Sequence, residues 1–217
     1  RANVSYYIPS RLQEGYGLST DAIEKLAADG ANIIVTVDCG VTALEQARRA
    51  RQLGVELLIT DHHEPRSELP DAGLIVHPTA IPPGGSNPHL SGAGVALKIA
   101  WAACRELTRT SKVGQEMSAY LQDATALAAL GLIADVVPLV GENRVIATAG
   151  LVRLRQTANA GLNALIEVAG LAKKASYDDY DVGFLLAPRL NAIGRMGHAA
   201  EAVELLTSAN PQRAMDI

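Results

Sequence analysis

The feature that most constrains the fold is a series of short apolar runs separated by helical segments in the N-terminal part of the chain. One run reads Ile33-Ile34-Val35-Thr36-Val37, a β-branched sequence typical of strands buried on both faces of a parallel sheet. We expect further strands at residues 4–8, 55–59 and 74–76. Parallel strands need long crossover connections, and the intervals between the later runs are long enough to hold helices.

Two of these intervals carry helix signals. A Ser-Thr-Asp cluster at residues 19–21 is a typical N-cap, and the helix after it ends at Gly30. Thr42 can cap a second helix, which ends at Gly54. The order of strand, helix, strand, helix and strand predicts an α/β fold with a parallel, doubly wound sheet flanked by helices.

The C-terminal portion of the chain is predicted to be largely helical. Helical patterns cover residues 91–107 and 118–134, and they continue after Pro138 to the end. Because the stretch 118–134 is almost wholly apolar, we expect it to be buried.

Composition excludes several classes of protein. With 48% hydrophobic residues and a net charge of −4, the chain is too apolar for a disordered protein. Cys39 and Cys104 are the only cysteines, which excludes a disulfide scaffold. No apolar run approaches the roughly 20 residues of a membrane span and no signal peptide is seen, so we expect a cytoplasmic protein without membrane association. Since the first residue is not Met and the last residues continue a helical pattern, we expect a fragment cut on both sides.

Polar residues cluster where two of the predicted strands end. Asp38 follows the strand at 33–37, and Asp61-His62-His63 follows the strand at 55–59. A right-handed crossover makes these strands parallel, so both groups lie at the same edge of the sheet. Ligands of open α/β sheets bind at this carboxyl edge. The two groups can therefore share one site.

Asp135 is a third candidate for this site. It follows the apolar stretch 118–134, and a carboxylate in apolar surroundings is costly unless it is paired or bound to a cation. Asp and His ligands suit Mn²⁺ or Mg²⁺, and the imidazole favours Mn²⁺. Other interpretations stay open: a turn role for Asp38, surface positions for the two histidines, and a helix cap for Asp135. Cys39 is disfavoured as a nucleophile, because it adjoins Asp38 and no His–Cys spacing supports it.

These residues are part of an ordered set of motifs that resembles the DHH phosphoesterase superfamily, and within it the bacterial RecJ family of single-stranded-DNA exonucleases. Asp61-His62-His63 is the superfamily signature. The resemblance covers nearly the whole chain and rests on residues 6–11, 14–18, 37–40, 60–64, 91–96, 131–139 and 188–196. It identifies residues 1–157 as the core of the DHH domain and residues 158–217 as its helical remainder with the start of a connecting helix.

The sequence also departs from the family pattern. The Asp-x-Asp-Gly motif that family members carry on their first strand does not occur in it, nor do the family's C-terminal domains. Because that motif supplies ligands to both metal ions in the family, the resemblance implies a fragment that binds metal weakly or not at all. We expect such a fragment to be inactive by itself.

The resemblance also implies a role for each site residue. Asp38 bridges two metal ions, and His62 and Asp135 hold one of them. Asp61 orients the neighbouring imidazole, and His63 faces the scissile phosphate rather than the metal. Two divalent ions about 3.5–4 Å apart lower the pKa of a bridging water and neutralise the phosphoryl oxygens during in-line attack.

A polar cluster near the C-terminal end is a candidate for DNA binding. It contains Arg189, Asn191 and Arg195, and the guanidinium fork matches phosphate geometry. We expect these residues to contact backbone phosphate near the 5′ end, with Arg11 as a further candidate. The alternative is a surface salt-bridge group or, for Arg11, a solvated loop residue.

The predicted function is metal-dependent phosphodiester hydrolysis by a 5′→3′ exonuclease on single-stranded DNA, in DNA repair and recombination. Alternatives with the same chemistry are a DHH-type oligoribonuclease, a nucleotide phosphatase and a pyrophosphatase. A non-catalytic replication scaffold is an alternative of another class. The resemblance implies Mn²⁺ or Mg²⁺ as cofactor, with two ions in each site of the intact enzyme. Single-stranded DNA is the implied substrate, and single-strand-binding protein and a recQ-type helicase are the implied partners.

Overall fold

The computed structural model describes residues 3–9, 15, 17–80, 87–108, 113–195 and 199–217. The chain divides into two compact units, Arg1–Gly84 and Gly85–Ile217. We call them the sheet unit and the helical unit and describe each by itself. The limits 1–157 and 158–217 stay a prediction, and the structure divides the chain elsewhere. Residues 85–157 group with the C-terminal helices because they share a core with them.

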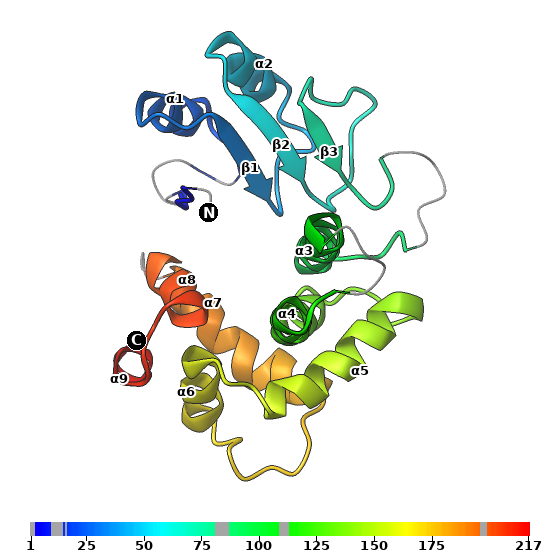
Figure 1. The fold of residues 1–217 in the computed structure, drawn as a ribbon, viewed down its shortest axis with the longest axis vertical. Helices are drawn as coiled ribbons and strands as arrows, with labels where there is room; N and C mark the ends of the chain where they lie inside the picture. Colours follow the sequence, from blue (N-terminus) through cyan, green and yellow to red (C-terminus); the bar gives the residue numbers. More distant parts are fainter. Residues whose placement is uncertain (1–2, 10–14, 16, 81–86, 109–112, 196–198) are drawn as a thin grey trace. The chain divides into compact units, whose positions relative to one another are not determined.

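The sheet unit contains a parallel three-stranded sheet in the order β1-β2-β3, which Figure 1 shows as three adjacent arrows. Val37 pairs with Thr60, and Thr60 pairs with Val76, so the three strands end in register. Its elements are α1 (Thr20–Ala28), β1 (Ile33–Val37), α2 (Leu44–Gln52), β2 (Glu56–Thr60) and β3 (Leu74–Val76). The predicted fold class, a parallel sheet flanked by helices, is confirmed.

Local sequence explains most of these elements. The Ser19 side chain accepts a hydrogen bond from the Ala22 N–H at 3.1 Å and so caps α1, as predicted. The cap predicted at Thr42 is wrong, because α2 begins at Leu44 after Ala43 and without a side-chain cap. The strand predicted at 4–8 is also wrong, since residues 3–9 belong to no strand.

The core of the sheet unit lies on one face of β1. Ile34 packs there with Ile23 of α1 and Ala47 of α2. The side chains that alternate with Ile34 are half exposed, with Ile33 at 54% and Val35 at 52%. Our expectation that this strand is buried on both faces is therefore wrong for the described residues, because the packed helices cover only the Ile34 face.

The helical unit is built around α4 (Gln115–Ala134), which packs against α3 (Gly92–Thr108) and α5 (Gly141–Arg155). Its core joins α4 and α5 to the later elements through Leu130, Leu154, Leu162 and Leu186. Those elements are α6 (Ala160–Val168), the π-helix η1 (Asp181–Leu186), α7 (Ala187–Arg195), α8 (Ala199–Thr207) and α9 (Pro211–Asp216). The predicted helical C-terminal portion is confirmed.

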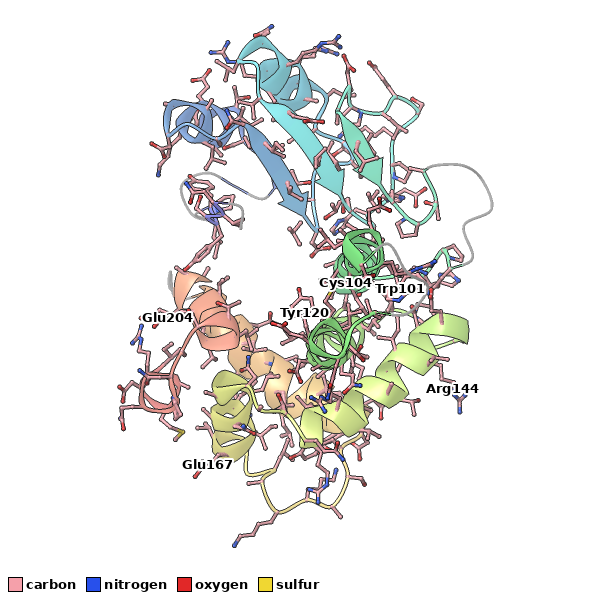
Figure 2. The ribbon with its side chains drawn as sticks, in the orientation of Figure 1. Trp101, Cys104, Tyr120, Arg144, Glu167 and Glu204 are labelled. Carbon is pink, nitrogen blue, oxygen red and sulfur yellow. The ribbon has the colours of Figure 1, made fainter. Side chains whose placement is uncertain are left out.

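Helix α4 corrects our expectation that no segment of the sequence is long and apolar enough for a membrane span. It spans 20 residues and is long and apolar enough to cross a membrane by length and composition, contrary to our expectation for the sequence. Its C-terminal half is buried, as predicted, through Ala126, Leu130 and Leu132, whereas Tyr120 in its N-terminal half is 58% exposed (Figure 2). A core helix of a folded unit passes the same length and composition test, and α4 contributes to such a core.

Candidate metal centre

The register of the sheet places three polar residues side by side at its carboxyl edge. The paired residues Val37, Thr60 and Val76 are followed by Asp38, Asp61 and His77. This is the edge at which open α/β sheets bind ligands. The predicted convergence of the Asp38 and Asp61-His62-His63 groups within the sheet unit therefore has a simple geometric cause.

Local backbone geometry fixes the turn after β1. Asp38 adopts a left-handed conformation with φ of 63°, which Asp tolerates better than most residues, and its N–H donates to the Thr60 carbonyl at 2.9 Å. The Thr36 hydroxyl donates to the Cys39 carbonyl at 2.7 Å. Gly40 has φ of 109°, and a Cβ there would lie 3.0 Å from the Thr36 hydroxyl. The turn thus needs both the small residue and the threonine.

Three potential metal ligands gather at this edge. Asp38, His62 and His63 offer ligand atoms that all lie within 4.8 Å of one another. The His62 Nε2 atom lies 3.1 Å from the Asp38 Oδ1 atom, and the two imidazole centroids are 4.5 Å apart. The Asp38 side chain is 51% exposed, so the cluster opens toward solvent. One divalent ion can therefore reach all three residues.

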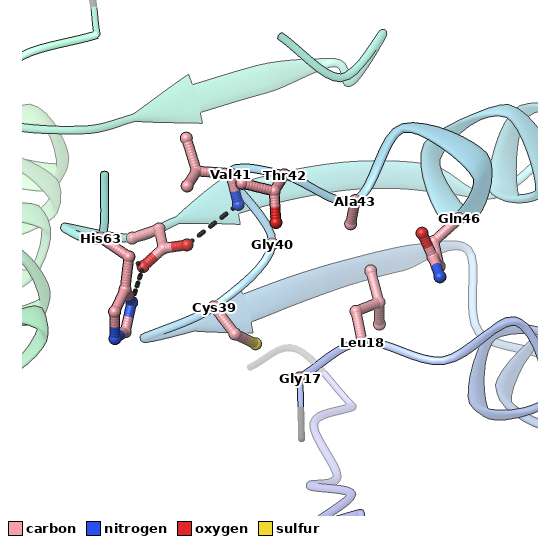
Figure 3. A pocket seen from close by; sticks show the side chains of 10 residues that line it. Gly17, Leu18, Cys39, Gly40, Val41, Thr42, Ala43, Gln46 and His63 are labelled. Carbon is pink, nitrogen blue, oxygen red and sulfur yellow. Dashed lines mark hydrogen bonds and ion pairs between the residues drawn. The ribbon is translucent and has the colours of Figure 1, made fainter. Parts of the chain in front are cut away.

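Asp61 is not one of the three potential ligands but holds two of them in place by hydrogen bonds. Its buried carboxylate accepts hydrogen bonds from the Val41 N–H at 2.9 Å, the His62 N–H at 2.8 Å and the His63 N–H at 3.2 Å. The His63 Nδ1 atom lies 2.7 Å from the same carboxylate (Figure 3). Burial alone raises the pKa of Asp61, but these hydrogen bonds outweigh it and hold that pKa below its usual value. Asp61 therefore stays ionised and ties the two loops together.

The donor set fits a divalent metal. When the His63 Nδ1–H donates to the Asp61 carboxylate, the lone pair of the ring lies on Nε2, the atom that then serves as metal ligand. One carboxylate with two imidazoles is a ligand set that suits Mn²⁺ and accepts Mg²⁺ less readily. The carboxylate–histidine pair is a common device for orienting a metal-binding imidazole.

A cavity of about 390 Å³ adjoins the cluster (Figure 3). Asp61 and His63 form one wall, and Gly17, Cys39 and Gln46 line the rest. Burial, together with the charges of Asp61 and Asp38, raises the pKa of the Cys39 thiol to about 11. The thiol is therefore protonated at neutral pH, which argues against Cys39 as a nucleophile.

The remaining predicted site residues are not brought to this cluster by the sheet. Asp135 belongs to the helical unit, where it is the C-cap of α4 and its N–H donates to the Gly131 carbonyl at 2.9 Å. It is exposed, so our expectation that it lies in apolar surroundings is wrong. Its place beside Asp38 stays a prediction.

The predicted phosphate-binding residues lie on α7. Arg189 is exposed, and its guanidinium donates to the Leu185 carbonyl at 2.6 Å. Asn191 is also exposed, and two residues along a helix turn the side chain by about 200°. Arg189 and Asn191 therefore lie on opposite sides of α7. Arg195 is the last residue of this helix, and Arg11 lies outside the described residues.

Sequence reasoning missed two residues that hold the cluster, Thr36 and His77. The signal for His77 was available, because it follows the predicted strand 74–76 just as Asp38 follows 33–37. Its imidazole is buried and lies 2.7 Å from the His63 carbonyl. The same edge argument that selected Asp38 selects His77.

The sequence of this chain matches a known protein family. Residues 1–132 match the family described as "DHH family, N-terminal domain". The chain belongs to the DHH family. The matched segment contains the cluster of Asp38, His62 and His63 together with Asp61, which holds it.

Several relatives of this chain are named single-stranded-DNA-specific exonuclease RecJ. The protein of Bacillus subtilis is 44% identical over 100% of this chain, and that of Haemophilus influenzae is 36% identical over the same share. The chain spans only 26% and 38% of the length of these two relatives. A solved structure of exonuclease RecJ bound to manganese superimposes with a TM-score of 0.83 at 35% identity, covering 97% of this chain and 50% of that one.

Proposed function

We propose that the gene product containing this chain is a metal-dependent exonuclease that degrades single-stranded DNA in the 5′→3′ direction. The observation that carries the proposal is the cluster of Asp38, His62 and His63 at the carboxyl edge of the sheet. Relatives of this chain are named single-stranded-DNA-specific exonuclease RecJ, and solved RecJ structures are bound to Mn²⁺ or Mg²⁺.

Each residue of the candidate site has its own role in this proposal. Asp38 and His62 hold metal, joined by Asp135 from the helical unit. When bound, divalent ions lower the pKa of the attacking water and neutralise charge on the phosphoryl oxygens. Asp61 keeps the His63 ring in one tautomer and orientation through the 2.7 Å contact to Nδ1. His63 then presents Nε2 to the scissile phosphate or to a metal ion beside it.

Substrate binding extends beyond this edge in the proposal. Arg11, Arg189, Asn191 and Arg195 contact backbone phosphate near the 5′ end, and the exposure of Arg189 is consistent with that role. The enzyme acts in the cytoplasm, in DNA repair and recombination. Single-strand-binding protein and a recQ-type helicase are its partners.

The experiment is a cleavage assay on single strands labelled at the 5′ or the 3′ end. The full-length gene product is incubated with Mn²⁺, and Asp38→Asn serves as the matched control because Asn also tolerates the left-handed backbone at this position. We expect early release of the 5′ label by the wild type and none by Asp38→Asn. Efficient cleavage of dinucleotides or pyrophosphate, with long strands left intact, would favour the small-substrate alternatives instead.

A further inference from the structure

His77, the residue directly after β3, lies outside the set of predicted metal ligands. The side chain is only 7% exposed. Its Nε2 atom lies 2.7 Å from the carbonyl oxygen of His63. On the other side of the ring, Nδ1 lies 3.1 Å from the backbone nitrogens of both Thr79 and Ala80. One imidazole thus joins the β3 turn to the loop that carries the two candidate metal-binding histidines.

These contacts define the tautomer of His77. Two backbone N–H groups donate to Nδ1, so Nδ1 must carry the lone pair. The partner of Nε2 is a carbonyl, which can only accept, so Nε2 must carry the proton. The ring therefore donates to His63 and is held in one orientation from both sides.

The contact to His63 complements the one made by Asp61. Asp61 accepts from the ring and the N–H of His63, whereas His77 donates to the carbonyl of the same residue. The Asp61 N–H in turn donates to the Val76 carbonyl at 3.2 Å, just before His77. His63 is consequently fixed at its side chain, its N–H and its carbonyl by groups that all lie in the sheet unit.

We infer that His77 is a positioning residue of the metal centre: it fixes the main chain of His63, and with it the placement of the His62 and His63 rings beside Asp38. This inference rests on the proposed function, because it assumes that the cluster binds metal. The competing role is local: His77 can simply close the turn at Thr79 and Ala80.

One substitution separates the two roles. In His77→Asn, the amide oxygen can still accept from the N–H groups two and three residues ahead, as Asn does in turns. The Asn side chain is shorter than His, so its amide nitrogen cannot reach the His63 carbonyl from that position. His77→Gln should instead keep the contact to the His63 carbonyl, because its longer side chain can bring an N–H donor to that oxygen. His89→Ala, which removes an exposed imidazole of the helical unit, is the matched control.

The readout is Mn²⁺ binding to the full-length gene product, followed by the electron paramagnetic resonance signal of free Mn²⁺, beside thermal unfolding of each variant without metal. We expect His77→Asn to melt close to the wild type and to bind Mn²⁺ about tenfold or more weakly, as is typical for residues that orient metal ligands. His77→Gln should retain Mn²⁺ affinity within about threefold, and His89→Ala should match the wild type.

Unchanged Mn²⁺ affinity in a folded His77→Asn variant would overturn the inference and leave His77 as a turn residue. If His77→Asn fails to fold, His77→Gln decides: a folded His77→Gln variant with tenfold weaker Mn²⁺ binding would overturn it, and retained affinity supports it. Failure of the proposed function looks different. Mn²⁺ binding that depends on His77, without release of 5′ nucleotides, would sustain this inference and refute the exonuclease.

Discussion

The sheet unit and the helical unit bury similar kinds of polar side chains but arrange them differently. Among the residues that the structure describes, the buried polar side chains of the sheet unit are Thr36, Thr60, Asp61 and His77, and all lie at the carboxyl ends of the three strands. Those described for the helical unit are Ser91, Asn143, Thr157 and Asp181, and they are spread over separate loops and helix starts. Buried polarity is concentrated in one unit and dispersed in the other.

The hydrogen bonds explain what this difference means. Ser91 caps α3 through the Gly94 N–H at 3.2 Å, and Asp181 pairs with Lys174 at 2.6 Å. Each of these residues satisfies a local need of its own helix or loop. Thr36, Asp61 and His77 instead converge on the turns that carry Asp38, His62 and His63. Concentrated buried polarity therefore marks a site, whereas dispersed polarity marks ordinary helix capping and loop fixation.

The largest expected effect tests the sheet unit. Asp38→Ala and Asp38→Asn in the full-length gene product should each lower the rate of cleavage of single strands by at least about 1000-fold, or about 4 kcal/mol of transition-state stabilisation. Both remove a carboxylate ligand, and neither removes a cation that binds phosphate. Affinity for single-stranded DNA should therefore change little. Rates come from release of a 5′ label with Mn²⁺, and affinities from fluorescence anisotropy without metal.

Comparing the two variants separates loss of the carboxylate from strain in the backbone of the turn. Asn accommodates the left-handed φ of 63° better than Ala, so Asp38→Asn should keep the turn intact while Asp38→Ala strains it. Equal losses of activity mean that the carboxylate itself is required. Retention of more than about a tenth of the wild-type rate by Asp38→Asn, a loss under ~1.4 kcal/mol, would contradict a ligand role.

The next effect tests the helical unit. The fully buried Asn143 donates to the carbonyls of His89 and Pro138 at 2.6 and 3.0 Å, and it accepts from the Asn87 amide at 2.6 Å. Asn143→Ala leaves these partners unsatisfied, so the free energy of unfolding should fall by about 2–4 kcal/mol. Because Asn143 is a structural residue, Mn²⁺ affinity of the folded protein should not change. Denaturant unfolding measures the loss of stability, and Mn²⁺ titration measures the affinity. A parallel loss of Mn²⁺ affinity would contradict the distinction between a structural helical unit and a metal-binding sheet edge.

How far the sequence predicts this molecule depends on which unit is considered. The rule that parallel strands end at one edge needs only strand positions, so Asp38 and Asp61-His62-His63 could be placed together from the sequence. The same rule reaches His77, but its hydrogen bond to His63 depends on a turn geometry that no periodicity encodes. In the helical unit no comparable rule exists. The expected burial of Asp135 was wrong because the residue lies past the end of the buried half of α4.

A smaller effect concerns packing between helices. An added Cβ at Gly150 of α5 would lie 2.3 Å from the Ala129 Cβ and 2.5 Å from the Thr125 carbonyl oxygen of α4. Gly150→Ala should therefore destabilise the helical unit by about 1–3 kcal/mol through overpacking. Gly183 in η1 has nothing within 4 Å of such a Cβ, so Gly183→Ala should be neutral or stabilising by up to about 1 kcal/mol. Thermal unfolding of the two variants gives the comparison, and equal effects would show that the α4–α5 contact can relax.

The smallest effect concerns a half-buried ion pair of the helical unit. Arg213 donates to both oxygens of the Glu204 carboxylate, from Nε at 2.8 Å and from Nη2 at 2.9 Å. These hydrogen bonds lower the pKa of Glu204 from its usual 4.5, against a smaller opposing effect of burial. A carboxyl group whose pKa is lower in the folded state stabilises the fold above pH 4.5, and this contribution is lost as the pH falls through the folded pKa.

Glu204→Gln should accordingly melt slightly below the wild type at pH 7, and the difference should shrink once the pH falls below 4.5. The effect is small because water still reaches the half-buried pair and screens its charges, so it should also shrink in high salt. Glu167→Gln on α6 is the control, since this exposed carboxylate (Figure 2) lies outside the Arg213 network. Melting temperatures are compared between pH 7 and pH 4 at low and high salt. A difference that stays constant across this range would mean that Glu204 acts through packing of its side chain rather than its charge. Mn²⁺ affinity should be the same in the Glu204→Gln and Glu167→Gln variants, because both carboxylates belong to the helical unit and neither lies at the carboxyl edge of the sheet.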